Sequence, residues 1–239
     1  MEIRGSVALV TGAGRGLGAS LVEALLAAGA SKVYAAARDV KRVSGSDPRV
    51  VPLTLDTTKA ADVAAAAARA SDVTLLVNNA GVLTSYDVLT TSPTELASDF
   101  RTNVYGTLDV IRAFVPGLER ANGGACIVNV LSLAALASFP ALGGYSASKA
   151  AAYSITQAMR PGLKARGIAV LAALPGPIDT DMVRALPISG KASPAETARG
   201  IVLGIARGDE EIYPDAMAQR MSALWSADPK GFERAFGAM

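Results

Sequence analysis

Tyr145 and Lys149 are four residues apart within GGYSASKAAAY, a run of small residues. On a helix this spacing places a phenol and an amine on one face, where they either pack together or cooperate in proton transfer. The chain contains no histidine, which excludes Ser-His-Asp and Cys-His catalysis and removes the commonest general acid and base. Proton transfer is therefore left to Tyr, Lys, Asp, Glu or the single cysteine, Cys126.

The composition is that of one globular domain. A chain of 239 residues can bury a large core, and no polar linker divides it. The formal net charge of +2 predicts no nucleic-acid partner. No run approaches the roughly 20 apolar residues of a membrane span, and the N-terminus lacks a secretory signal, so we expect no membrane contact and a cytoplasmic location. Cys126 lies in a strand-like run, which predicts a core thiol, and we expect no metal site.

Short apolar runs alternate with longer Ala- and Leu-rich segments, and the nearly continuous apolar runs indicate strands buried on both faces. The predicted strands are residues 7–12, 31–37, 49–55, 73–79, 125–132 and 168–176, and the predicted helices are 16–28, 58–70, 93–119, 145–166 and 193–208. A short last strand is expected at EEIYP, and one or two short helices at 215–239. This alternation predicts an α/β fold with a doubly wound parallel sheet (Rossmann fold), formed as a single domain over residues 1–239.

Four glycines, Gly12, Gly14, Gly16 and Gly18, lie between the first predicted strand and helix. Such glycines let the chain turn tightly and let a pyrophosphate approach the free N–H groups at a helix N-terminus. A glycine pair alone is more often a turn, but a position in the first strand–turn–helix unit is the context that dinucleotide binding requires. We therefore predict a dinucleotide site.

The end of the second predicted strand, YAAARD, bears on which dinucleotide binds. An acid there would accept a hydrogen bond from the ribose 2′-hydroxyl, whereas Ala37 followed by Arg38 leaves room for a 2′-phosphate held by a guanidinium. Arg15, inside the glycine loop, is placed to reach the same phosphate. The alternative is that Arg38 is a solvated charge and Asp39 binds the ribose. We favour NADP(H) over NAD(H).

Six motifs follow one another along the chain. They are TGAGRGLG (11–18), LLVNNAG (75–81), RTNVYGTL (101–108), VNVLSL (128–133), YSASK (145–149) and LPGPIDTDM (174–182). Together they resemble the short-chain dehydrogenase/reductase family over residues 6–182. The resemblance implies an oxidoreductase that transfers a hydride between a nicotinamide cofactor and a carbonyl or alcohol substrate. Tyr145 and Lys149 are then expected to be catalytic rather than a packing pair.

The resemblance implies a role for each matching residue. Tyr145 donates a proton to a carbonyl or removes one from an alcohol, and Lys149 lowers the pKa of Tyr145 and holds the nicotinamide ribose. Ser132 hydrogen-bonds the substrate oxygen, and Asn103 helps to hold a water between Lys149 and solvent. The expected cofactor contacts are Gly12, Arg15, Leu17, Gly18, Arg38, Asp56, Thr57, Asn79, Ala80, Gly81, Tyr145, Lys149, Pro175, Ile178 and Thr180. Asp56 is also a candidate helix N-cap.

Elementary electrostatics agrees with the role of Lys149. Tyrosine titrates near 10 in water, so proton exchange at neutral pH needs a shift of roughly 2–3 pKa units. An ammonium about 4 Å from the phenol supplies roughly 4 kcal/mol at an effective dielectric constant of about 20. One lysine is therefore sufficient in magnitude.

The segment 181–195, which covers the substrate in relatives, is short and predicts a small lid over an open pocket. The candidate pocket residues are Leu83, Ala134, Leu136, Leu142, Pro177 and Met182, with core packing as the alternative for each. Because none is charged, they favour a hydrophobic ketone, aldehyde or secondary alcohol. Pro161 is expected to kink or end the helix at 145–166.

Three other functions share these features. A 3-oxoacyl-thioester reductase would need basic residues for an acidic carrier protein, for which Arg112, Arg160 and Arg184 are available. An NAD-dependent alcohol dehydrogenase and a catalytically silent dinucleotide-binding regulator are the other two. The resemblance also implies a homodimer or homotetramer built through the helices at 93–119 and 145–166.

Overall fold

Seven parallel strands form one sheet in the computed structural model, which describes residues 1–43, 45–121, 123–184 and 189–238. The strands are β1 (Val7–Thr11), β2 (Lys32–Ala37), β3 (Val50–Thr54), β4 (Leu75–Asn78), β5 (Ala125–Val130), β6 (Ile168–Ala173) and β7 (Glu211–Ile212). Their spatial order is β3-β2-β1-β4-β5-β6-β7, so the direction of winding reverses between β1 and β4. Ligands of such sheets bind beyond the carboxyl ends of the strands at this reversal. The predicted Rossmann fold is confirmed.

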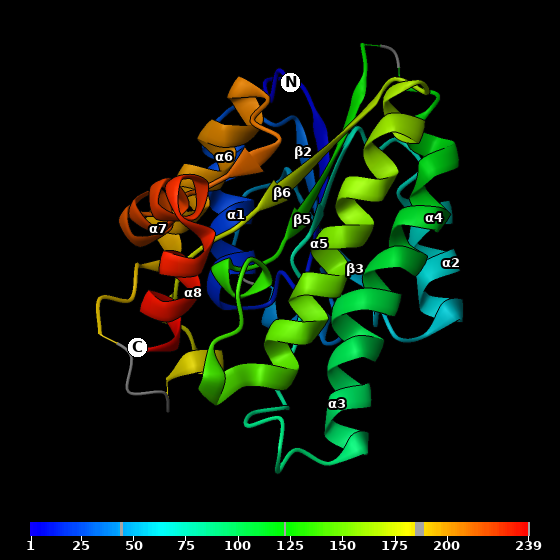
Figure 1. The fold of residues 1–239 in the computed structure, drawn as a ribbon. Coiled ribbons are helices and arrows are strands. Elements are labelled where there is room, and N and C mark those ends of the chain that lie inside the picture. Colours follow the sequence, from blue (N-terminus) through cyan, green and yellow to red (C-terminus); the bar gives the residue numbers. More distant parts are fainter. Residues whose placement is uncertain (44, 122, 185–188, 239) are drawn as a thin grey trace.

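Helices cover both faces of the sheet (Figure 1). One face carries α1 (Gly16–Ala27) and α6 (Pro194–Arg207), and the other carries α2 (Ala60–Arg69), α4 (Thr107–Leu118) and α5 (Gly143–Lys164), with α3 (Pro93–Phe100) leading into α4. The C-terminal pair, α7 (Ala216–Ala227) and α8 (Pro229–Gly237), lies beside the segment that follows β5. In the described part of the chain, no helix is both long and apolar enough to cross a membrane.

Alternate residues of a strand belong to two different apolar clusters. In β1, Ala8 and Val10 pack with residues of α1 and α6, whereas Leu9 packs with residues of α2 and α4. All three are completely buried because helices cover both faces. This two-sided burial explains why the strands are nearly continuous apolar runs.

Two predicted helices differ from those observed. The helix expected at 93–119 is interrupted after α3 by a π-helical segment, Arg101–Gly106, which contains Asn103. Such segments occur frequently at functional sites. Pro161 was expected to kink or end its helix, and it does not end it, because α5 continues through Pro161 to Lys164. A proline this close to the C-terminus disturbs only the last turn.

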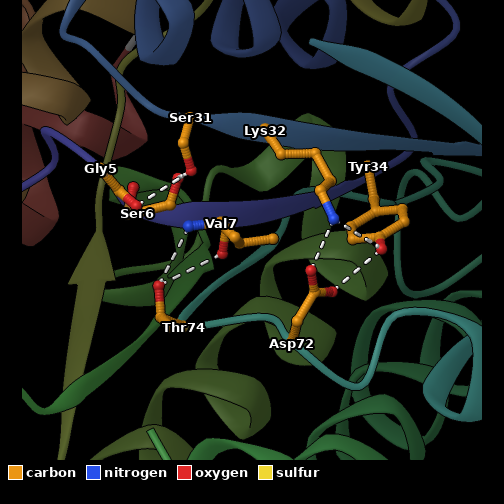
Figure 2. A network of polar contacts seen from close by, with 8 residues as sticks. All are labelled: Gly5, Ser6, Val7, Ser31, Lys32, Tyr34, Asp72 and Thr74. Carbon is orange, nitrogen blue, oxygen red and sulfur yellow. Dashed lines mark hydrogen bonds and ion pairs between the residues drawn. The ribbon is translucent and has the colours of Figure 1, made fainter. Parts of the chain in front are cut away.

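A polar network fixes the N-terminal ends of the central strands, at the opposite end of the sheet from their carboxyl ends (Figure 2). Asp72, just before β4, accepts hydrogen bonds from Lys32 Nζ at 2.6 Å and from the Tyr34 hydroxyl at 2.9 Å, which joins it to β2. The Ser31 hydroxyl donates to the carbonyl of Ser6 at 2.9 Å, and Val7 N donates to Thr74 Oγ1 at 3.2 Å. These contacts set β1, β2 and β4 in register.

At Gly18, α1 packs so closely against the glycine loop that there is no room for a side chain. A Cβ at Gly18 would lie 2.2 Å from the carbonyl oxygen of Gly12 and 2.7 Å from Nδ2 of Asn79. We expect Gly18→Ala to cost about 1–3 kcal/mol, or roughly 2–12 °C in melting temperature, because the helix must move away from the loop. The change should be measured by thermal unfolding.

The matched control is Gly162→Ala in α5, where the described residues place nothing within 4 Å of an added Cβ. Alanine is the better helix former, so this variant should be as stable as the parent or up to about 1 kcal/mol more stable. Equal melting temperatures for the two variants would contradict the close packing of α1.

Candidate active site

The reversal of strand order opens a cleft of about 900 Å³ at the carboxyl ends of the strands. Its floor includes the first turn of α1, where Gly16, Leu17 and Gly18 line the cleft. Arg15 is the N-cap of this helix, and its side chain makes no capping hydrogen bond. The N–H groups of the first turn and the positive end of the helix dipole are therefore available to an anion. This arrangement fits a pyrophosphate.

The glycine loop is tied to the segment that follows β4. Thr11 Oγ1 accepts hydrogen bonds from the backbone N–H groups of Asn79 and Ala80, both at 2.9 Å, and Asn79 Nδ2 donates to the Thr11 carbonyl at 2.9 Å. Gly12 has a φ of 67°, and a Cβ there would lie 3.0 Å from Ala80 Cα. Both the backbone conformation and the close approach require glycine at this position.

Arg38 and Arg42 line the cleft at the end of β2. Asp39, the proposed alternative ribose acid, caps the short 3₁₀ turn Val40–Arg42 by accepting from Lys41 N at 3.1 Å. It also pairs with Arg42 at 3.7 Å. Sequence reasoning missed Arg42, although its position in the turn directly after β2 was a usable signal.

Asp56 lies at the cleft and also caps a turn. Its Oδ1 accepts from the N–H group of Thr58 at 3.0 Å and from the Thr58 hydroxyl at 2.7 Å, while α2 itself begins at Ala60. Burial raises the pKa of Asp56, but the Thr58 hydrogen bonds, Lys59 and Arg38 together lower that pKa below its usual value. Asp56 is therefore an ionised carboxylate whose orientation is fixed by its hydrogen bonds to Thr58.

Arg15 uses one N–H group of its guanidinium in an exposed ion pair, and its contact with a phosphate stays a prediction. Its Nη1 donates to Asp181 Oδ2 at 3.1 Å, and Asp181 also pairs with Arg184. All three residues line the cleft. This contact joins the glycine loop to the beginning of the segment 181–195, which was predicted to cover the substrate. Residues 185–188 of that segment lie outside the described residues.

Tyr145, Ser132 and Lys149 meet in the cleft. Lys149 is only 5% exposed, and its Nζ donates to the carbonyl of Val130, the last residue of β5, at 3.0 Å. The same Nζ lies 5.7 Å from the centre of the Tyr145 ring. Ser132 follows β5 and accepts from Ala134 N at 3.1 Å, which fixes its hydroxyl at the start of a 3₁₀ turn. The predicted helical spacing thus brings phenol and amine to one site.

The pKa of Tyr145 is raised, not lowered. Burial is the largest cause, the negative charge of Asp99 adds to it, and a hydrogen bond with Ser132 opposes it. Burial lowers the pKa of Lys149 to about 8, with Asp99 acting in the opposite direction. The expectation that Lys149 lowers the pKa of Tyr145 stays a prediction, since the net upward shift is set by burial. Desolvation of the phenol is the largest effect on the pKa of Tyr145, and the Lys149 ammonium donates its hydrogen bond to the Val130 carbonyl.

Asn103 lies behind the cleft rather than in its lining. Its side-chain amide donates to the Val82 carbonyl at 3.0 Å and to Ser148 Oγ at 2.9 Å, and Oδ1 accepts from Val82 N at 2.9 Å. Ser148 in turn donates to the backbone carbonyl of Tyr145 at 2.7 Å. Asn103 therefore connects the segment after β4 with the turn of α5 that carries Tyr145.

Asp99, one turn before Asn103, was missed by sequence reasoning. It is fully buried and accepts from the N–H group and hydroxyl of Thr84 at 2.9 and 2.7 Å and from Ser85 N at 3.1 Å, with a further short hydrogen bond from the Ser85 hydroxyl. Ser85 contacts the start of α5, since a Cβ at Gly144 would lie 2.4 Å from its Oγ. Asp99 is a positioning residue for this wall of the site.

All the predicted cofactor residues line the cleft, and their contacts with a cofactor stay predictions. The predicted cofactor residues that line the cleft are Gly12, Arg15, Leu17, Gly18, Arg38, Asp56, Thr57, Asn79, Ala80, Gly81, Tyr145, Lys149, Pro175, Ile178 and Thr180. Of the three arginines suggested for a carrier protein, only Arg184 lines the cleft. Arg160 instead pairs with Glu211 at 2.6 Å and is mostly buried.

The cleft has an apolar end near Tyr145. Five of the six candidate pocket residues line the cleft: Leu83, Ala134, Leu142, Pro177 and Met182. Leu136 does not, because the 3₁₀ turn after Ser132 directs it into the core between α5 and the C-terminal pair. The lining residues that were missed include Phe139, Met217 and Phe236. These three come from a loop and from the C-terminal pair, for which the sequence offered no motif.

Residues 6–189 match the sequence model of the family described as short chain dehydrogenase. A short chain dehydrogenase from Burkholderia cenocepacia, solved in complex with NADP, is 42% identical, covers 99% of both chains and has a TM-score of 0.92. A short chain dehydrogenase/reductase from Burkholderia phymatum, solved with NAD, is 27% identical, covers 96% of both chains and has a TM-score of 0.83.

A curated relative, a short chain dehydrogenase of Aspergillus terreus, is 33% identical over 198 residues, which is 77% of this chain and 43% of the relative. An uncharacterized short-chain type dehydrogenase/reductase of Sinorhizobium fredii is 36% identical over 86% of this chain and 39% of its own length. The chain thus spans about two fifths of these two curated relatives.

The buried ammonium of Lys149 makes stability depend on pH. Its pKa falls from 10.5 in the unfolded chain to about 8 in the fold, so between these values the unfolded chain binds more protons and stability rises with pH. Below pH 8 the whole cost, about 3 kcal/mol, is present. We expect Lys149→Met to remove this rise in stability with pH. At pH 7 the variant should gain free energy of unfolding because no ammonium is buried, and this gain is reduced by the loss of the hydrogen bond to the Val130 carbonyl.

The measurement is the free energy of unfolding in urea from pH 7 to 10, taken as the difference between variant and wild type so that contributions from Cys126 and the tyrosines cancel. Lys164→Met, which removes an exposed lysine from the same helix, is the control. A difference that stays constant with pH for Lys149→Met would contradict a desolvated ammonium.

Proposed function

The chain belongs to the short-chain dehydrogenase family, and from this premise we propose that it is an NADP(H)-dependent carbonyl reductase that acts, reversibly, on hydrophobic ketones or aldehydes and their secondary alcohols. One observation carries the proposal: a phenol with a raised pKa, a serine hydroxyl and a buried ammonium meet beside an apolar wall. We also propose that residues 1–239 form a single domain, in which cofactor and substrate share one cleft.

Tyr145 is the proton donor in this proposal. The phenol is protonated at neutral pH, as delivery of a proton to a carbonyl oxygen requires. The Ser132 hydroxyl hydrogen-bonds the same oxygen as negative charge develops on it. When bound, the nicotinamide cofactor supplies the hydride, which no side chain can provide. Lys149 holds the nicotinamide ribose and supplies positive charge beside the phenol.

The residues at the end of β2 support NADP(H) as the cofactor. Arg38 and Arg42 both line the cleft, and two guanidinium groups suit a 2′-phosphate. Asp39 is engaged as a cap and ion pair, which makes it a poorer ribose acceptor than the alternative assignment requires. The Burkholderia cenocepacia relative was solved with NADP and the Burkholderia phymatum relative with NAD, so the preference rests on these arginines.

The apolar end supports a hydrophobic substrate. Two of the three arginines suggested for a carrier protein do not support a 3-oxoacyl-thioester reductase, because Arg112 pairs with Asp109 on α4 and Arg160 is held by Glu211, whereas Arg184 does line the cleft. All three catalytic side chains are in place, which disfavours a silent regulator. We further propose a cytoplasmic homodimer or homotetramer built through α4 and α5.

The test follows NADPH and NADH oxidation in parallel against alkyl and aryl ketones, aldehydes, a polyol's keto form, a keto acid and acetoacetyl thioester. We expect NADPH with an aryl or alkyl ketone to be fastest. Arg38→Ala and Arg42→Ala should each raise the KM for NADPH about 10–100-fold, as expected for the loss of a charge-assisted hydrogen bond of roughly 1.5–3 kcal/mol, and leave the KM for NADH within about twofold.

Arg112→Ala is the control, since this exposed arginine of α4 does not line the cleft. A wild-type preference for NADH would overturn the cofactor assignment and favour an alcohol dehydrogenase. Faster turnover of the keto acid or sugar-like substrate than of an aryl ketone would overturn the substrate class, and a preference for the thioester would establish the carrier-linked alternative.

A further inference from the structure

The C-terminal pair is attached directly to the cleft. Asp215, the buried N-cap of α7, accepts from Ala218 N at 2.8 Å and from Gly176 N at 2.9 Å. Gly176 lies in the cleft lining after β6, and a Cβ there would lie 3.3 Å from Cβ of Met217. One carboxylate therefore caps α7 and sets its first turn against the cleft.

A series of aromatic ring contacts connects α7 through α8 to the apolar end of the cleft. The Trp225 and Phe232 rings meet edge to face with centres 5.4 Å apart, and Phe232 stacks on Phe236 at 5.3 Å. Phe236 then meets Phe139 edge to face at 5.7 Å. Phe139 belongs to the loop between Ser132 and α5, beside which α8 lies (Figure 1).

Two phenylalanines of α8 differ in what they contact. Phe232 is 0% exposed and is a core residue of the stack that does not line the cleft. Phe236 is 7% exposed and does line it. Tyr145 packs against the same apolar cluster that holds both rings.

We propose that Phe236 of the C-terminal helix is a specificity-determining residue, whose ring closes the apolar end of the cleft and limits the size of the carbonyl compound presented to Tyr145. This inference rests on the proposed function. Phe139, Met217 and Phe236 all line the cleft, and the wall that these three residues form carries no charge. An aromatic wall of this kind accepts a flat apolar group through ring-to-ring contact and excludes groups that extend past it.

The experiment compares kcat/KM for acetophenone and for the larger 2-acetylnaphthalene. Truncating the wall enlarges the apolar end, so Phe236→Ala should raise the ratio of naphthyl to phenyl kcat/KM at least tenfold. Phe236→Leu, a smaller change, should give an intermediate ratio. Both variants should bind NADPH with a Kd within about twofold of wild type, measured by NADPH fluorescence.

Phe232→Leu is the matched control, because it weakens the same stack without altering the cleft lining. It should lower the melting temperature and leave the ratio within twofold of wild type. If Phe232→Leu changes the ratio as much as Phe236→Ala does, the effect comes from docking of α8 and the proposal is wrong. An unchanged ratio in Phe236→Ala also overturns it.

A second readout separates this inference from the proposed function. Calorimetric titration of 1-(2-naphthyl)ethanol and 1-phenylethanol, with and without NADPH, reports affinity without turnover. Phe236→Ala should shift relative affinity toward the naphthyl alcohol by at least tenfold. If the wild type reduces no carbonyl compound, the proposed function fails while this titration still decides the role of Phe236; equal relative affinities in wild type and variant would refute that role.

Discussion

The contact between the Lys149 ammonium and the Val130 carbonyl is the constraint on which the site depends. It joins α5 to the end of β5, and thereby sets Tyr145, one turn earlier on the helix, beside Ser132, two residues beyond the strand. Burying the ammonium is unfavourable, as its pKa of about 8 indicates, and the negative charge of Asp99 offsets part of this cost. The fold must therefore supply stability elsewhere to keep this amine in place.

Much of that support comes from α3 and the π-helical segment. Asp99 and Asn103, four residues apart, hold the backbone between Val82 and Ser85 through a ladder of hydrogen bonds. Asn103 extends the ladder through Ser148 to α5. The π-helical winding at Asn103 accompanies this contact. The wall beside Tyr145 is thus fixed by the side chains of Asp99 and Asn103, which do not themselves line the cleft.

The sequence was informative where local patterns determine structure. Apolar runs, the glycine loop and the Tyr145–Lys149 spacing each act over a few residues, and they predicted the sheet, the cleft and the meeting of the catalytic side chains. Long-range packing was not predictable in this way. Phe236 contacts Phe139 across nearly a hundred residues of chain. The net pKa of Tyr145 depends on burial by several elements at once, which an estimate from the Lys149 charge alone leaves out. In the sequence Asp99 looks like an ordinary polar residue of a helix, and its hydrogen bonds to Thr84 and Ser85 are evident only in the fold.

A protonated phenol, a hydroxyl and a dinucleotide cleft meet in one site, and we propose that Tyr145 delivers the proton. The most direct measurement is turnover and NADPH binding by Tyr145→Phe. Loss of a general acid typically costs about 10²–10⁴-fold, so kcat with the best ketone should fall by that factor while the Kd for NADPH stays within about twofold. Turnover close to that of wild type with NADPH still bound would contradict the claim.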